Sequence, residues 1–202
     1  GYIVDWNVSG ITDMSYLFED KVNFNSDISN WKTQNVIKMD HMFYQCTKFN
    51  SDLSKWVTKK VTTMERMFYE CDVFNSDLSK WETQEVTSLE FMFFDAYLFN
   101  SNISEWDISK VTSLVSTFHY AGKFNSDLSK WATAQVTRMQ STFKHAKAFN
   151  SDLSNWKTGQ VSTMGGTFYN AKKFNSDITK WDVSKIVNMN QMFKYAAVFD
   201  KT

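Results

Sequence analysis

Hydrophobic positions recur along this chain at a constant spacing of 25 residues. All of the tryptophans fall on one series with that spacing, namely Trp6, Trp31, Trp56, Trp81, Trp106, Trp131, Trp156 and Trp181. Two phenylalanine series, one from Phe18 to Phe193 and one from Phe24 to Phe199, keep the same step. A constant period of this length is typical of a solenoid, in which each coil buries its apolar face against its neighbours. The sequence therefore predicts a single repeat domain over 1–202 with about eight coils.

The second half of each repeat predicts a short helix. In one repeat, Val61, Met64 and Phe68 follow the spacing of an apolar helix stripe. Thr62 and Glu65 form a T-x-x-E pair, which is typical of the capping box at a helix start. We therefore expect two or three helical turns in every coil, from about Thr62 to Glu70 in this one.

The first half of each repeat, FNSDLSKW at 49–56 and its close copies, predicts a turn and a very short strand. It is rich in Asn, Ser and Asp, which favour turns and hydrogen bonds from side chain to backbone. Strands that stack from coil to coil lie about 4.8 Å apart, whereas packed helices need about 8–10 Å. The helical side should then be longer. The expected fold is a curved, right-handed, leucine-rich-repeat-like α/β solenoid with one short extended segment and one short helix per coil.

The residues that recur in every coil are expected to form structural ladders. The Phe, Leu or Ile, and Trp of FNSDLSKW should fill the same core layer in each coil, and the Asp should cap a nearby turn. The Asn should satisfy backbone groups that have no partner within the turn. The predicted ladder positions are Trp31, Trp56, Trp81, Trp106, Trp131, Trp156, Asn50, Asn75, Asn100 and Asn125.

The pattern VTxMxxMFxxAxxFNxxLxxW, with its recurrent FNSDLSKW, resembles a bacterial surface-protein repeat of 25 or 26 residues that is grouped with BspA-like leucine-rich repeats. The resemblance covers essentially the whole chain, although the usual LxxLxLxxN strand of leucine-rich repeats is absent. It implies a cell-surface or secreted protein, often bacterial, with a binding or adhesion role, and it supplies no catalytic residues.

Positions that vary between repeats are the candidates for specific binding. A possible surface stripe contains Tyr44, Tyr69, Phe94 and His119, which share one flank of the expected helices. Phe91 and Tyr97 would add apolar surface in the same region, and aromatic side chains are enriched at binding hot spots. The alternative is that a residue such as Tyr69 only packs on a methionine of the next coil.

Composition excludes several functional classes. The chain has 22 basic and 22 acidic residues and only two arginines, Arg66 and Arg138, which argues against nucleic acid as a partner. No apolar run is long enough to span a membrane, so we expect no membrane insertion by this segment. No carboxylate pair, nucleophile with a base, or phosphate loop stands out from the repeat, so we expect neither catalysis nor a cofactor.

Four residue types were weighed as special sites. Cys46 and Cys71 occupy a small-residue position and are expected to be core residues, unless their Cα atoms lie within about 7 Å and pair as a disulfide. The regular Asp could hold calcium between coils, but only one occurs per repeat, so no metal site is expected. The threonine row that includes Thr62 could order ice, although helix capping explains it. The three histidines occupy different repeat positions and are expected to be ordinary surface residues.

The function expected from the sequence is non-catalytic recognition or adhesion at the cell surface, with a host protein, a matrix protein or a glycan as the ligand. The alternative is a mechanical spacer or stalk that presents another domain, and the minor alternative is an ice-binding or calcium-stabilised solenoid. Because the repeat pattern is already under way at both ends, we expect a fragment of a longer surface protein and possible end-to-end association through uncapped termini.

Overall fold

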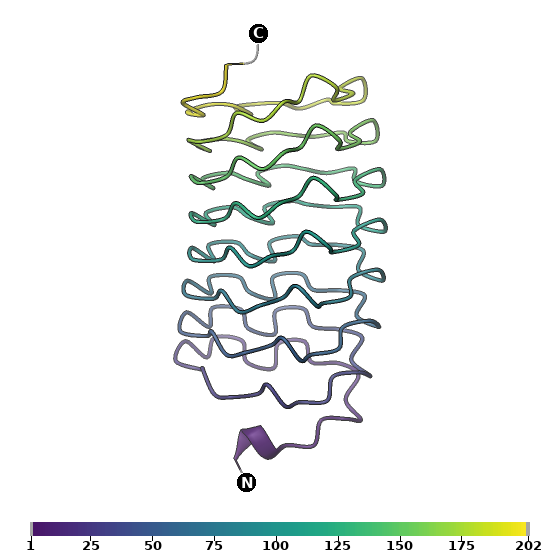
Figure 1. The fold of residues 1–202 in the computed structure, drawn as a ribbon, viewed down its shortest axis with the longest axis vertical. Coiled ribbons are helices and arrows are strands. Elements are labelled where there is room, and N and C mark those ends of the chain that lie inside the picture. The colour runs from purple at the N-terminus through teal and green to yellow at the C-terminus, as the bar shows by residue number, and fades with distance from the viewer. Residues whose placement is uncertain (1, 201–202) are drawn as a thin grey trace.

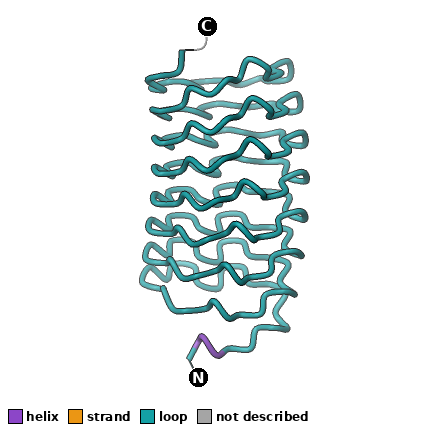
Figure 2. Tube along the Cα trace, in the orientation of Figure 1, coloured by secondary structure: helices purple, strands orange, loops and turns teal. Residues whose placement is uncertain are grey.

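The computed structural model describes residues 2–200, and the expected domain bounds at 1 and 201–202 lie outside them. The chain winds into successive coils that lie one above another, with the two termini at opposite ends of the stack (Figure 1). The only regular element among the described residues is the 3₁₀-helix η1, Ile3–Asp5 (Figure 2). None of these residues belongs to a helix long and apolar enough to cross a membrane.

The expected helix in the second half of each repeat is wrong, because this part of the coil consists of consecutive turns. In residues 64–71, hydrogen bonds between residues three apart close the turns, such as Met67 N–H to Met64 O at 3.2 Å. The N–H groups of Arg66, Phe68 and Glu70 instead donate to carbonyl oxygens of the next coil, at 3.0, 2.9 and 2.7 Å. An α-helix would have kept these donors within its own segment.

We call this run of consecutive turns in each coil the turn segment. Two positions of every turn segment have a left-handed backbone, which a right-handed helix cannot contain. In residues 64–71 they are Arg66 and Glu70, with φ of 53° and 54°. A positive φ at the third residue of a turn is the feature of type II turns, where glycine is usual. Only Gly166 meets that preference among the described residues, and the other members of the two series are Tyr16, Asp20, His41, Gln45, Phe91, Asp95, Ser116, Tyr120, Ser141, His145, Asn170, Gln191 and Tyr195.

The expected strand in FNSDLSKW is also wrong. Parallel pairing is limited to isolated single-residue bridges in another part of the coil, such as Lys38 with Thr63. Within 49–56, backbone donors are satisfied by side chains. Ser54 N–H donates to Asp52 Oδ1 at 2.8 Å, and Leu53 N–H donates to Ser76 Oγ of the next coil at 3.1 Å. The α/β leucine-rich-repeat-like fold is therefore incorrect, and the curvature that we expected from a wide helical side loses its physical basis.

The core is a set of stacked aromatic side chains. Trp56 and Trp81 stack with ring centroids 6.5 Å apart and planes 2° apart, and Phe43 stacks on Phe68 at 5.6 Å. The indole N–H of Trp81 donates to Leu53 O at 3.2 Å, which satisfies the polar atom of a side chain that is only 3% exposed. Each buried aromatic side chain removes a large apolar area from water, so these stacked rings contribute strongly to the core.

Asparagine side chains connect the coils at the surface. The side-chain oxygens of Asn50, Asn75 and Asn100 each accept the backbone N–H of the Asn one coil further on, at 2.8, 2.8 and 2.7 Å. Each bond satisfies a backbone donor that the irregular coil leaves unpaired.

Candidate functional site

The consecutive turns create one continuous surface along the stack, which we call the turn face. It consists of residues 15–20, 40–45, 65–70, 90–95, 115–120, 140–145, 165–170 and 190–195. The third and fourth residues of a segment point into the core, as shown by Met67 and Phe68, which are fully buried, although Leu17 of the first segment is exposed. The other positions mostly point outwards, because the left-handed residues reverse the chain direction twice, and Ser116 is a buried exception.

Four of the six candidate residues meet on this face. Tyr44 stacks on Tyr69 with ring centroids 4.6 Å apart, and Tyr69 stacks on Phe94 at 4.5 Å with planes 3° apart. His119 meets the edge of the Phe94 ring at 4.7 Å. The rings are half-buried because they cover one another, whereas Met67 points into the core. Tyr69 therefore packs on aromatic rings of the adjacent coils.

The aromatic row continues through residues that sequence reasoning missed. Tyr120 stacks on His119 at 4.5 Å and on His145 at 4.4 Å, and His145 lies 5.3 Å from Tyr169. The row shifts here by one position in the repeat, since Tyr120 and His145 follow the position of Tyr69. The sequence does contain an aromatic residue at this next position, but on a helix that position lies away from the flank that carries Tyr69.

The two remaining candidates differ in their positions. The Phe91 ring lies 6.0 Å from Phe94, and the Arg66 guanidinium sits over it at 4.5 Å, so Phe91 belongs to the turn face. Tyr97 lies over Gly122 of the next coil, where any Cβ atom would clash with the ring. Within 2–200, no aromatic contact joins Tyr97 to the row.

All three histidines belong to the turn face, although they occupy different positions in the repeat. Both ring nitrogens of His119 are buried without a hydrogen-bond partner. Burial, together with the nearby charges of Lys144 and His145, lowers the pKa of His119 to about 3. Burial also lowers the pKa of His41 and of His145. The aromatic row is therefore uncharged at neutral pH.

The charges of the chain are separated along the stack. Residues 1–100 carry 15 acidic and nine basic side chains, whereas residues 101–202 carry seven acidic and 13 basic ones. On the turn face, the first four segments contain one basic residue and the acidic residues Glu19, Asp20, Asp40, Glu65, Glu70, Glu90 and Asp95. The last four segments contain Lys144 and Lys194 and no acidic residue. Burial and the neighbouring Asp72 and Glu70 raise the pKa of Asp95, as expected where like charges gather.

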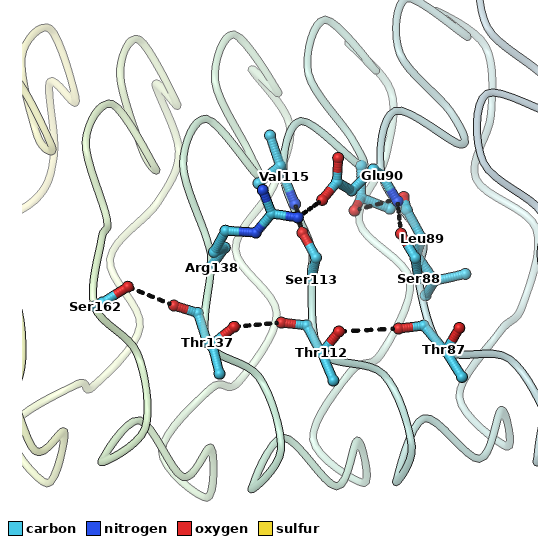
Figure 3. A network of polar contacts seen from close by, with 11 residues as sticks. Thr87, Ser88, Leu89, Glu90, Thr112, Ser113, Val115, Thr137, Arg138 and Ser162 are labelled. Carbon is cyan, nitrogen blue, oxygen red and sulfur yellow. Dashed lines mark hydrogen bonds and ion pairs between the residues drawn. The ribbon is translucent and has the colours of Figure 1, made fainter.

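The threonine row does not cap helices. Thr112, Thr137 and Ser162 each donate their hydroxyl to the backbone oxygen of the equivalent residue one coil earlier, at 3.3, 3.1 and 3.2 Å (Figure 3). No group of three or more acidic, histidine or cysteine side chains among the described residues is arranged to hold a metal ion.

The two cysteines are free and buried. Cys46 Sγ donates to Phe18 O, and Cys71 Sγ donates to Phe43 O, both at 3.0 Å. Burial raises the pKa of Cys46 to about 12, and that of Cys71 well above the usual value. They are core residues, as expected for a small-residue position.

Comparison with known protein families decides the membership of the chain. The family described as "Mycoplasma protein of unknown function, DUF285" matches over residues 1–106 and again over 87–202. The chain belongs to the DUF285 family. Two overlapping matches to one family agree with the tandem repeat of the chain, whereas the more specific resemblance to BspA-like leucine-rich repeats is not confirmed. No curated protein and no solved structure matches this DUF285 chain.

Proposed function

We propose that the protein is a non-catalytic recognition module, displayed at a cell surface or secreted, that binds a protein partner through the turn face. The observation that carries this proposal is the continuous aromatic row from Tyr44 through Phe94 to Tyr169. Aromatic side chains provide large contact areas at a low cost in conformational entropy.

The stacking within the row favours a protein partner over a glycan. A sugar or a nucleic-acid base that stacks on an aromatic ring needs an open ring face. Both faces of Tyr69 are covered, by Tyr44 at 4.6 Å and by Phe94 at 4.5 Å, and Tyr69 in turn covers one face of each of these two rings. Their edges remain, and an aromatic edge carries partial positive charge that attracts carbonyl and carboxylate oxygens. Such oxygens are abundant on protein surfaces.

The second candidate function is a spacer that holds another domain at a distance. It is supported by the ladders that connect every pair of adjacent coils, such as the Asn50 to Asn75 bond at 2.8 Å and the Trp56 to Trp81 stack. A spacer should tolerate substitutions over its whole surface, whereas a recognition module should lose binding when the turn face is changed.

The test is binding of the labelled chain to a panel of matrix proteins, host cells and glycans, with and without EDTA. The variant Phe91→Ser, Phe94→Ser removes two aromatic rings of the turn face, one of them in the row, and Tyr97→Ser is the matched control because no aromatic contact joins Tyr97 to the row. Circular dichroism and thermal melting would verify native folding of both.

Saturable binding to a protein that is lost in the double variant and kept in the control would support the proposal. Equal binding by both variants would contradict the assignment to the turn face. No binding to any member of the panel would favour the spacer, and loss of binding in EDTA alone would favour a calcium-stabilised module.

A further inference from the structure

The turn face differs from the rest of the surface in how its charges are distributed along the stack. Away from the face, acidic and basic side chains occur in both halves, and some of them meet one coil apart, as Lys110 does with Glu85 at 2.6 Å and Lys130 does with Glu105. On the turn face, the acidic charges lie in the first half of the stack and the basic charges lie in the second half.

Most charges of the turn face form no ion pair with another residue of the described range 2–200. Glu19, Asp20, Glu65, Glu70 and Asp95 form no ion pair with any described residue, since the four ion pairs in this range involve other acidic groups. Glu90 is the exception, because Arg138 reaches it from two coils further on (Figure 3).

The basic half is equally unpaired. Lys144 lies 5.1 Å from the centre of the Tyr169 ring and Lys194 lies 5.2 Å from that of Tyr195, and neither forms an ion pair within the described range.

The boundary between the two halves is aromatic. Phe91 and Phe94 lie on the acidic side of it, and His119 and Tyr120 lie on the basic side. Tyr120 is 41% exposed and meets the edge of the Phe94 ring at 6.0 Å. An aromatic centre with charged surroundings is the usual anatomy of a specific protein interface.

We propose that the partner of the turn face is the turn face of a second copy of this chain, bound in antiparallel orientation about a two-fold axis between Phe94 and His119. The proposal rests on the recognition function proposed above and names its partner. A two-fold interface uses the same patch on both subunits and must therefore be self-complementary. Glu70 then faces Lys144 of the partner subunit, Glu19 faces Lys194 of the partner subunit, and the aromatic centres meet on the axis.

Other arrangements of two copies fit the surface less well. A parallel side-by-side pair would place the acidic halves together and the basic halves together, which is repulsive. End-to-end contact would bring opposite charges together but would leave the aromatic centre uncovered.

The first experiment is sedimentation equilibrium of the full chain over a range of protein and salt concentrations. We expect a reversible dimer at low ionic strength and a dissociation constant that rises with salt, since salt screens exposed charges. Glu70→Lys alone and Lys144→Glu alone should each raise this constant about tenfold or more. The two changes in one chain should restore dimerisation, because each new lysine faces a new glutamate. Glu85→Lys, outside the turn face, should leave the constant unchanged.

The orientation is tested by mixing a Glu70→Cys chain with a Lys144→Cys chain under oxidation. The antiparallel dimer predicts a cross-link in the mixture and none in either chain alone, and the native Cys46 and Cys71 are buried and do not interfere. A monomer under all conditions, or oligomers that grow beyond the dimer, would overturn the proposal. Binding of another protein through the same face would still support the recognition function, so the two proposals can fail separately.

Discussion

Single residues stabilise this protein mostly by contacts with the equivalent residue of the next coil. The indole N–H of Trp106 donates to Leu78 O at 3.1 Å, and its ring stacks on Trp81 at 6.3 Å. The Trp106 ring also packs against Phe93 at 6.2 Å, and the side chain is only 3% exposed, so that one substitution removes several buried contacts. The terminal tryptophan, Trp6, is 53% exposed and stacks on one side only, on Trp31 at 6.4 Å.

Trp106→Ala should lower the free energy of unfolding by about 3–5 kcal/mol, because it leaves a large cavity among buried rings. Trp6→Ala is the control and should cost much less, since this side chain is half exposed. Chemical denaturation monitored by circular dichroism would measure both. Equal effects of the two substitutions would show that the tryptophan series is not a continuous core layer.

His119 should make the folded state sensitive to acid. The unfolded chain binds a proton on this side chain near pH 6.5, whereas in the folded chain the pKa is lowered to about 3. The stability that depends on a neutral His119 is therefore complete above pH 6.5 and is lost progressively as the pH falls towards 3. The carboxylates of the Asp turns, such as Asp52, have lowered pKa values and respond only below about pH 3.8.

His119→Phe would continue the stack from Phe94 without a titratable group. Its melting temperature should fall less than that of the unchanged chain between pH 6.5 and pH 4. Some dependence should remain, because His41 and His145 also have lowered pKa values. An unchanged pH profile would contradict the burial of His119.

At the scale of the element, the turn segment replaces the helix that the sequence pattern predicts. Its left-handed residues carry side chains in a backbone region that costs about 1–2 kcal/mol for residues other than glycine. Hydrogen bonds to the next coil, such as Phe68 N–H to Met92 O at 2.9 Å, compensate for this strain because they satisfy backbone groups that would otherwise be buried unpaired.

Substitutions in opposite directions at one position of the turn segment distinguish consecutive turns from a helix. Ser141 and Gly166 are equivalent residues of adjacent coils, with φ of 55° and 65°. Ser141→Gly should raise the free energy of unfolding by up to about 1 kcal/mol, and Gly166→Ala should lower it by about as much. Thermal denaturation would measure both. Opposite signs would indicate a helix, where glycine is less favourable than alanine by about 1 kcal/mol.

Much of this element could not be predicted from the sequence. Val61, Met64 and Phe68 are fully buried, as they would be on the inner face of a helix, so their spacing does not distinguish a helix from the turns. Glycine is the usual signal for a left-handed residue, and only Gly166 gives it. The repeat period, in contrast, could be read directly from the spacing of Trp and Phe. The stacking of Tyr44, Tyr69 and Phe94 could be predicted because residues at the same position of successive repeats are neighbours. Tyr120 and His145 could not be predicted in this way, because they occupy the next position of the repeat.

At the scale of the whole molecule, the turn face combines one aromatic row with two oppositely charged halves. Neither the aromatic row nor the charge separation can be recognised in a single repeat. The formal net charge of zero also gives no indication of the charge separation. The segregation becomes informative only when the coils are stacked, since it then places Glu19 and Lys194 at opposite ends of one surface. We expect specificity to reside in this arrangement and stability to reside in the residues that recur.

The direction of the hydrogen bonds along the turn face gives the molecule an electrical polarity. In each turn segment, alternate peptide units accept a bond from the preceding coil and donate one to the following coil, as at Phe91 N–H to Val115 O and Asp95 N–H to His119 O. Peptide units aligned in this way add their dipoles, of about 3.5 D each, as they do in a helix. The positive end points to the last coil, where the lysines also lie, so that backbone and side chains reinforce one another. The monomer should therefore have a large permanent dipole moment, measurable by transient electric birefringence, and an antiparallel pair should cancel it. A permanent-dipole contribution to the birefringence that falls as the protein concentration rises would report that cancellation, and a dilute monomer without this contribution would contradict the aligned peptide columns.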